Sequence, residues 1–179
     1  ARIQENGRFG LEFIRRDARM AGFWGCNSSG DPFNRLTSDT PLPNFLLNSY
    51  VTGTDNDGLN KSDSITFTQA ASGSMVTDVD MDSASSVVSV VSADSLGDFA
   101  DGDVLIITDC VTADIFEFKS TGTELSKAYA AGSRLYRVQQ IKYFIAYGAD
   151  SEQHSLRQLT CPGLGACTGE GNELDELVE

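Results

Sequence analysis

Residues 2–26 constrain the fold of this chain more than any other segment. When they are placed on a helical wheel at about 100° per residue, the apolar residues gather on one arc of about 200°. The opposite arc holds mostly charged and polar side chains. We therefore expect an amphipathic helix over residues 1–25, with a wide apolar face made of Ile3, Gly7, Phe9, Gly10, Leu11, Phe13, Ile14, Ala18, Met20 and Ala21.

Two polar residues, Asn6 and Asp17, fall inside the apolar arc of this helix. A charge placed there needs a partner or must lie outside the docked surface, because an unpaired buried carboxylate is costly. Asp17 is therefore a candidate for a buried pairing group. The first residues offer no capping side chain, which predicts that the helix continues upstream of Ala1.

Glycines and aromatic residues mark the expected end of the helix. Gly22 and Gly25 can each adopt the left-handed conformation that stops a helix. Trp24 between them has two interpretations. It caps the core where the helix meets the sheet, or it contacts a neighbouring subunit together with Phe23.

The remaining chain, residues 26–179, is expected to be rich in β-strands, because apolar runs alternate with turn residues. Residues 103–109 are almost continuously apolar and predict a central strand, and a short helix fits residues 123–131. The short connections favour an antiparallel sheet. The expected fold class is α+β, one domain over residues 1–179 in which the helix packs on an antiparallel sheet, with strands at 64–69, 75–79, 87–91, 103–109, 111–119, 136–147 and 154–161.

Four cysteines allow three fully paired connectivities. Cys161 and Cys167 flank a small flexible loop that can close on itself. The favoured pairing is therefore Cys161–Cys167 with Cys26–Cys110, in an oxidising compartment. A zinc site is disfavoured, since the sequence has no C-x-x-C motif.

The net charge of −13 argues against a nucleic-acid partner, because phosphate binding needs clustered Lys and Arg. Five of the 13 Lys and Arg residues nevertheless lie in the helical segment. Either they form a solvated helix face, or they meet acidic neighbours in an assembly. The candidates for subunit contact are Asn6, Arg8, Arg15, Arg16, Asp17, Arg19 and Trp24.

The sequence contains few of the residue patterns that are typical of enzymes. A hydrolase of the serine or cysteine type needs a base beside its nucleophile, and His154 is the single histidine. No G-x-S-x-G, P-loop or dinucleotide motif occurs. We expect no enzyme, no catalytic residue, no metal ligand and no cofactor.

Two acidic segments raise the question of calcium binding. Residues 53–63 place carboxylates at alternate positions before Gly58, as in part of a calcium loop, but Ser64 stands where a bidentate Glu is needed. Asp78, Asp80 and Asp82 repeat the spacing. A solvated turn and an alternating strand edge explain the two segments better.

Several segments resemble one known family. R-I-Q-E-N-G-R-F (2–9) and R-D-A-R-M-A-G-F-W-G-C (16–26) are similar to the membrane-proximal helix of PilW-type minor pilins of type IV pili. Residues 62–67 and the G-D-V-L-I-I-T-D-C segment (102–110), followed by A-D-I-F, are similar to the body of that family. In the family, a hydrophobic half-helix precedes such a segment and the chain continues after a Leu-Val-Glu like the one at 177–179, so the body is expected to lack a C-terminal piece.

This resemblance implies a structural role. The protein would be a pilin-like subunit, anchored in the inner membrane before assembly, that helps to initiate type IV pilus assembly in a tip-associated complex at the cell surface. Its partners would be other minor and major pilins, bound through packing of the N-terminal helix. The alternative is a secreted adhesive or ligand-binding β domain, with or without calcium, whose helix completes its own core.

Overall fold

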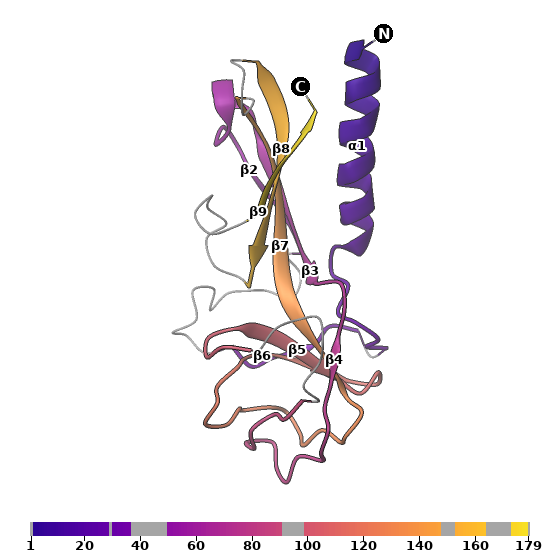
Figure 1. Cartoon of the computed structure of the whole chain (residues 1–179), viewed down its shortest axis with the longest axis vertical. Helices are drawn as coiled ribbons and strands as arrows, with labels where there is room; N and C mark the ends of the chain where they lie inside the picture. Colours follow the sequence, from indigo (N-terminus) through magenta and orange to yellow (C-terminus); the bar gives the residue numbers. More distant parts are fainter. Residues whose placement is uncertain are drawn as a thin grey trace.

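The computed structural model describes residues 2–28, 30–36, 50–90, 99–147, 153–163 and 173–178. Within these residues the chain forms one α-helix, followed by strands that occupy the rest of the molecule (Figure 1). The elements are α1 (Arg2–Met20), β1 (Phe33–Asn34), β2 (Val51–Thr54), the 3-10 helix η1 (Leu59–Lys61), β3 (Ser64–Ala70), β4 (Met75–Val76), β5 (Val104–Thr108), β6 (Ala113–Glu117), β7 (Arg134–Tyr147), β8 (His154–Pro162) and β9 (Glu173–Val178).

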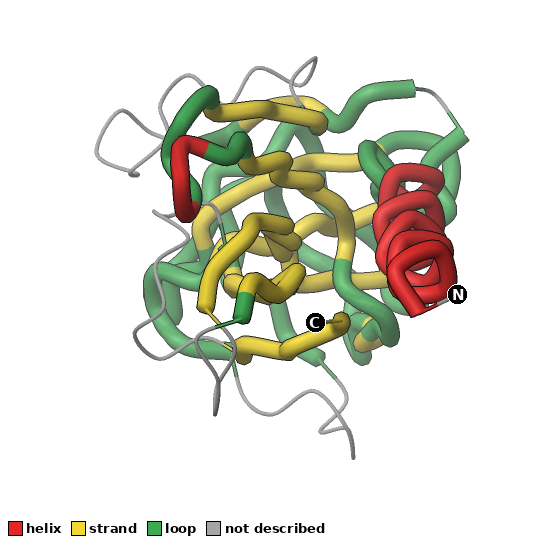
Figure 2. Tube along the Cα trace, turned by 90° about the horizontal axis from the view of Figure 1, so that it is seen from above, coloured by secondary structure: helices red, strands yellow, loops and turns green. Residues whose placement is uncertain are grey.

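The predicted fold class, a helix packed on an antiparallel sheet as in a pilin, is wrong. The structure is mostly β, with 38% of residues in strands and 15% helical, and its sheet is mixed and curls into a half-barrel. The short strand β1 pairs with β6 in parallel, whereas the other paired strands run antiparallel. The predicted helix is present, but a single helix covers only one side of this curled sheet (Figure 2).

The length of β7 explains the curl. β7 has 14 residues, and its two parts pair with different strands. Residues 134–137 pair with β5 and β4, while residues 138–147 pair with β3 and β8. A strand of this length accumulates the right-handed twist of β-structure, so the sheet at its two ends faces different directions. β7 runs along the long axis of the molecule and bends between the two parts (Figure 1).

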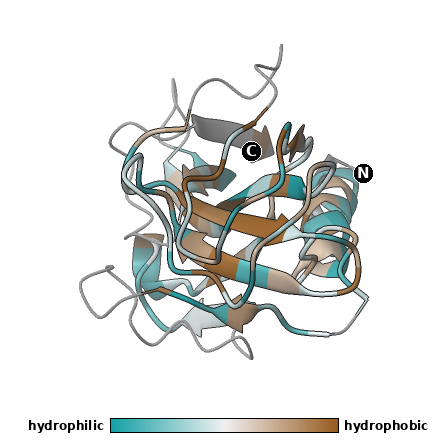
Figure 3. Cartoon of the chain, turned by 90° about the horizontal axis from the view of Figure 1, so that it is seen from below, coloured by the Kyte–Doolittle hydropathy of each residue, from teal (hydrophilic) through white to brown (hydrophobic). Residues whose placement is uncertain are grey.

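The two faces of β5 are both buried. Val104 and Ile106 pack with Trp24 and Tyr136 on one side, while Leu105 and Ile107 pack on the other side against residues that include Met81, Leu125 and Tyr129. This double burial is the reason that residues 103–109 read as a continuous apolar run rather than an alternating one. Figure 3 shows these apolar strands at the centre of the body, surrounded by more polar segments.

The short helix expected at residues 123–131 does not form. This segment instead runs in an irregular conformation between Gly122 and Gly132 and covers the core with Leu125 and Tyr129. The carboxylate of buried Asp114 in β6 holds it, since Asp114 accepts hydrogen bonds from the Tyr129 hydroxyl (2.8 Å) and the Ser126 hydroxyl (2.6 Å). Backbone N–H groups of the segment also find acceptors outside it, since Ser126 N donates to Asp114 at 3.2 Å and Leu125 N donates to the Ala84 carbonyl at 3.0 Å.

The other predicted strands form with small differences. β3, β5, β6, β7 and β8 lie where strands were expected, and β7 and β8 pair antiparallel as predicted. The run at 75–79 forms only the two-residue strand β4. Residues 87–90 form no strand, and Val90 makes one isolated bridge to Thr77. Residues 148–152, which connect β7 to β8, lie outside the described residues.

Candidate assembly surface on the N-terminal helix

α1 runs beside the part of the sheet formed by β3, β7, β8 and β9 (Figure 1). Its inward stripe contains Phe13 and Ile14, which pack against the buried cluster of Phe67, Ile141 and Tyr143. Gly10 lies on the same stripe and is buried. The helix is therefore docked by a narrow apolar contact rather than by its whole apolar face.

Asp17 is the charged residue within this inward stripe, and it is 4% exposed. Its carboxylate accepts hydrogen bonds from the Tyr143 hydroxyl at 2.5 Å and from Gln158 Nε2 at 3.4 Å. Arg16 Nε lies 2.9 Å from the other carboxylate oxygen. Burial and the hydrogen bond to Asp17 raise the pKa of Tyr143. The partners of Asp17 thus lie within its own chain. Its position in the apolar arc is explained by this contact with the sheet and not by a neighbouring subunit.

The end of α1 is fixed to the body by its backbone and by side chains. Gly22 N donates to the Thr68 carbonyl at 2.9 Å, and Ala70 N donates to the Phe23 carbonyl at 2.8 Å. Trp24 is 4% exposed, and its ring meets the ring of Tyr50 edge-on at 5.9 Å between centroids. Trp24 therefore lies in the core rather than on a surface open to a neighbour.

A disulfide completes this anchor. Cys26 is bonded to Cys110, in the turn between β5 and β6, as the favoured pairing predicted. Cys161 is disulfide-bonded as well. Its predicted partner, Cys167, lies outside the described residues, so the Cys161–Cys167 pair stays a prediction.

The docked stripe covers only part of the apolar arc predicted from the sequence. On the helical wheel, Phe13, Asp17, Gly10 and Ile14 span about 100°, about half of the arc. Large apolar side chains on both sides of this stripe stay in solvent: Phe9 is 56% exposed, Met20 38% and Leu11 67%. α1 thus leaves two apolar edges uncovered.

We call these edges the Phe9 flank and the Leu11 flank. The Phe9 flank consists of Phe9 and Met20, with Arg16, Glu5 and Glu12 at its outer border. The Leu11 flank consists of Gly7, Leu11 and Ala18, all exposed, with Arg8 and Arg15 at its outer border. By the same wheel, the outer borders of the two flanks meet on the solvent side of the helix. Arg16 lies beside Phe9 there, Glu5 and Glu12 come next, and Arg8, Arg15 and Arg19 lie between Glu12 and Leu11.

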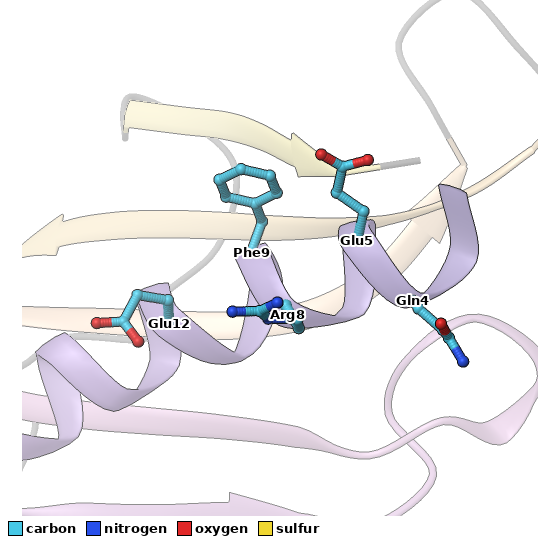
Figure 4. A pocket seen from close by; sticks show the side chains of 5 residues that line it. All are labelled: Gln4, Glu5, Arg8, Phe9 and Glu12. Carbon is cyan, nitrogen blue, oxygen red and sulfur yellow. The ribbon is translucent and has the colours of Figure 1, made fainter. Parts of the chain in front are cut away.

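An open groove of about 670 Å³ follows the first turns of the helix on this outer side. Figure 4 shows Phe9 and Glu5 extending from one side of the helix, with Gln4 on the other. The described part of its lining combines one aromatic ring with charged groups of both signs and consists of Gln4, Glu5, Arg8, Phe9 and Glu12. Such a surface suits another amphipathic helix better than a small polar ligand.

The residues predicted for subunit contact divide into two groups. Arg8, Arg15, Arg16 and Arg19 are exposed along α1, whereas Asn6 is half-buried. Asp17 and Trp24 are buried, as described above. The prediction omitted Phe9, Leu11 and Met20, which carry most of the exposed apolar surface of the helix. The width of the apolar arc could have identified them. An arc of about 200° is wider than the stripe that docks on one sheet, so some of its apolar side chains must stay exposed.

Residues 53–63 form an exposed turn region around η1, as predicted, whereas the strand edge predicted at residues 78–82 does not form. Asp57 accepts a hydrogen bond from Ser64 and pairs with Lys142 Nζ at 2.8 Å, and Asp63 accepts from the backbone of Asn56. Asp80 accepts from Ala131 N at 2.8 Å. Over the described ranges, no group of three or more His, Cys, Asp or Glu residues is placed to hold a metal ion.

His154 lies at the exposed start of β8. Its Nε2 atom is 3.0 Å from Asn60 Nδ2, and its ring lies 6.0 Å from that of Tyr147 between centroids. The contacts involve side chains of the β2–β3 connection and of β7, and they tie the turn around η1 to the sheet. This arrangement explains the histidine as a surface packing residue.

Comparisons of the chain with family models, curated proteins and solved structures found no match. Within the part of the chain that the structure describes, no helix is both long and apolar enough to cross a membrane. The function of α1 is therefore argued from its own surface.

Proposed function

We propose that this protein is a structural subunit that enters a multi-subunit filament through α1, and that the filament is a type IV pilus with other minor and major pilins as partners. The observation that carries the proposal is the pair of uncovered flanks on α1. A helix that served only its own domain would expose one polar face, whereas this helix exposes apolar side chains on both sides of its docked stripe.

The sequence resemblance of residues 2–26 to minor pilins supports the choice of filament. The helix-on-antiparallel-sheet architecture that the same resemblance implied is not part of the proposal, because the sheet is mixed and curled. The Cys26–Cys110 disulfide supports a location in an oxidising compartment, in keeping with a route through the periplasm to the cell surface. The proposed role is assembly, with no catalytic step.

The anchor at the end of α1 suits this role. A helix that joins neighbouring subunits has to transmit their position to the body without turning about its own axis. The Asp17–Tyr143 bond sets the rotation of the helix, and the disulfide fixes its end. Both flanks are thus presented in one orientation, which reduces the ordering cost of association.

The experiment mixes the protein with soluble domains of candidate minor and major pilins and follows complex formation by size-exclusion chromatography. The test variant is Phe9→Ser with Leu11→Ser. The matched control is Val79→Ser with Val87→Ser, because these valines are 55% and 46% exposed on the loops after β4. Burial of one large apolar side chain contributes about 1.5 kcal/mol or more, so the test variant is expected to lose about 100-fold in affinity.

Two results would contradict the proposal. One is the absence of complex formation with every pilin tested, accompanied by specific binding of the wild-type domain to glycans or host surfaces, which would favour the adhesive β domain. The other is equal loss of binding in the helix variant and the control variant, which would show that the flanks of α1 are not the contact.

A further inference from the structure

A second hollow of the molecule lies beside β6, away from the helix. It is an open pocket of about 300 Å³, and the described part of its lining comes from Arg35 after β1, Ser85 after β4 and residues between 116 and 124. A volume of this size lies at the lower end of the range for small-molecule sites. Figure 1 draws β6 in the lower part of the molecule and α1 beside the upper part. The pocket can therefore be occupied while α1 contacts other subunits.

The wall of this pocket is held together by contacts between two segments that are distant in the chain. The buried Thr123 donates a hydrogen bond from its hydroxyl to the Ser86 carbonyl at 3.0 Å. Gly122 has a φ of 134°, and a Cβ at this position would lie 2.7 Å from the carbonyl oxygen of Ser85. Only glycine permits so close an approach in this conformation. The shape of the pocket is thus fixed by the fold.

A buried carboxylate orients the arginine of the pocket. Asp114 is 0% exposed and is held by Ser126 and Tyr129, and Arg35 Nε lies 3.4 Å from its Oδ1 atom. Among the described residues, Asp114 is the one ion-pair partner of Arg35, and this contact uses one of the five N–H donors of the guanidinium. The Arg35 side chain is 39% exposed and lines the pocket. Its terminal nitrogens are therefore oriented for the bidentate recognition of a carboxylate.

The charges of the lining are balanced, unlike those of the whole chain. The described lining contains Arg35 and Lys119 together with Glu117 and Glu124, whereas the chain has 13 basic and 26 acidic residues. Lys119 and Glu124 are exposed and form no ion pair with another described residue. The two glutamates disfavour a ligand with several negative charges, because like charges repel at close range. A ligand with one carboxylate and several neutral polar groups fits this lining better.

The remaining side chains of the lining indicate which neutral groups these are. Thr121 and Ser85 offer exposed hydroxyls, and the Glu124 carboxylate can accept hydrogen bonds from hydroxyl groups of a ligand. Phe116 also lines the pocket but is 1% exposed, so its ring offers no face on which an aromatic ligand could stack. The lining thus matches an aliphatic ligand that carries a carboxylate and several hydroxyls.

We infer that this pocket binds an acidic sugar, a uronic or a sialic acid at the end of a glycan. Arg35 and Lys119 bind the carboxylate of the sugar, and Glu124, Thr121 and Ser85 bind its hydroxyls. The open mouth of the pocket leaves room for the rest of the glycan. This binding activity is separate from the proposed role of α1 in assembly, since it uses another part of the molecule.

The test titrates methyl β-D-glucuronide into the isotope-labelled full chain and follows the backbone amide shifts by NMR. We expect a Kd of about 1 mM, as is typical of a single small polar ligand, with shifts at Ser85 and at residues 117–124. A methyl glycoside of sialic acid is titrated in parallel, and the tighter binder of the two identifies the kind of acidic sugar. Methyl β-D-glucoside is the ligand control, because a neutral hydroxymethyl group replaces the carboxylate. It should bind about tenfold more weakly or less.

Two variants locate the site. Arg35→Lys keeps the charge beside Asp114 but removes the planar fork, and should weaken glucuronide binding about tenfold. Lys119→Gln changes an exposed side chain and should weaken binding about threefold, because one exposed charge is lost. The matched control is Lys61→Gln, the same change at an exposed residue of η1, which should leave binding unchanged. Circular dichroism verifies that each variant is folded.

Three results would overturn the inference: no binding of either acidic sugar at about tenfold the expected Kd, equal binding of the glucuronide and the glucoside, or equal weakening by Lys119→Gln and Lys61→Gln. The Phe9→Ser with Leu11→Ser variant separates this inference from the proposed function, because it should keep sugar binding while it loses pilin binding. Pilin binding by a wild type that binds no acidic sugar would remove this inference alone.

Discussion

The hydroxyl of Tyr143 donates a 2.5 Å hydrogen bond to the carboxylate of Asp17, joining residues that lie 126 positions apart in the chain. Both residues are almost completely buried, at 2% and 4% exposed. This bond links the middle of β7 to the inward stripe of α1. It thereby sets which side of the helix faces the sheet, and so which residues form the Phe9 flank and the Leu11 flank.

Tyr143→Phe tests this link. The substitution keeps the ring but removes one donor to a buried carboxylate, and we expect the free energy of unfolding to fall by about 1–3 kcal/mol in urea denaturation. Tyr147→Phe is the control, because Tyr147 is 54% exposed and its change should stay within about 0.5 kcal/mol. Equal effects of the two substitutions would show that the Asp17–Tyr143 bond is not a stabilising contact.

Alkaline pH should weaken the fold through its buried tyrosines, chiefly Tyr129 and Tyr143. Burial raises the pKa of both Tyr143 and Tyr129, and their hydrogen bonds to Asp17 and Asp114 raise it further. Above the ordinary tyrosine pKa of about 10, the unfolded chain loses these protons and the folded chain keeps them, so stability falls as pH rises. The loss approaches about 1.4 kcal/mol per pH unit for each tyrosine.

The measurement is the free energy of unfolding as a function of pH, from neutral into the alkaline range. The Tyr143→Phe variant should show a smaller alkaline slope than the wild type, because one proton with a raised pKa has been removed from the linkage. An unchanged slope in that variant would assign the alkaline loss to other groups.

Removal of the Cys26–Cys110 disulfide should lower stability strongly. The bond closes a sequence separation of 84 residues, for which the chain-entropy relation gives about 4–5 kcal/mol, and measured losses in small domains are about 2–5 kcal/mol. The variant is Cys26→Ala with Cys110→Ala, compared with the wild type in urea under oxidising conditions. A loss below about 1 kcal/mol would mean that the backbone bonds around Gly22 and Ala70 suffice to hold the helix end.

Gly25→Ala should be more damaging than Gly102→Ala, although both glycines have positive φ, at 74° and 95°. A Cβ on Gly25 would lie 2.8 Å from Cζ of Tyr136, in the core, whereas at Gly102 nothing lies within 4 Å. We expect about 1–2 kcal/mol for the backbone strain at Gly102 and about 2–4 kcal/mol at Gly25. Thermal unfolding of both variants measures the difference, and equal losses would exclude the steric contribution of Tyr136.

Local patterns predicted the elements whose sequence has one dominant period or composition. The helix wheel identified α1, and the continuous apolar run identified β5 as a buried strand. Residues 123–131 show where such patterns fail, because Leu125 and Tyr129 are held by core packing and by Asp114, which comes from a strand earlier in the chain. A side-chain bond between distant residues leaves no periodic signal.

The sequence by itself determined that the chain begins with an amphipathic helix, that its apolar arc is about 200° wide, and that Asp17 lies inside that arc. These are properties of neighbouring residues on one helix. Only the tertiary structure decided how much of the arc is covered, since coverage depends on the curl of a sheet built around β7 and on the bond from Tyr143 to Asp17. The remainder of the arc, with Phe9 on one side and Leu11 on the other, is the surface left for another molecule.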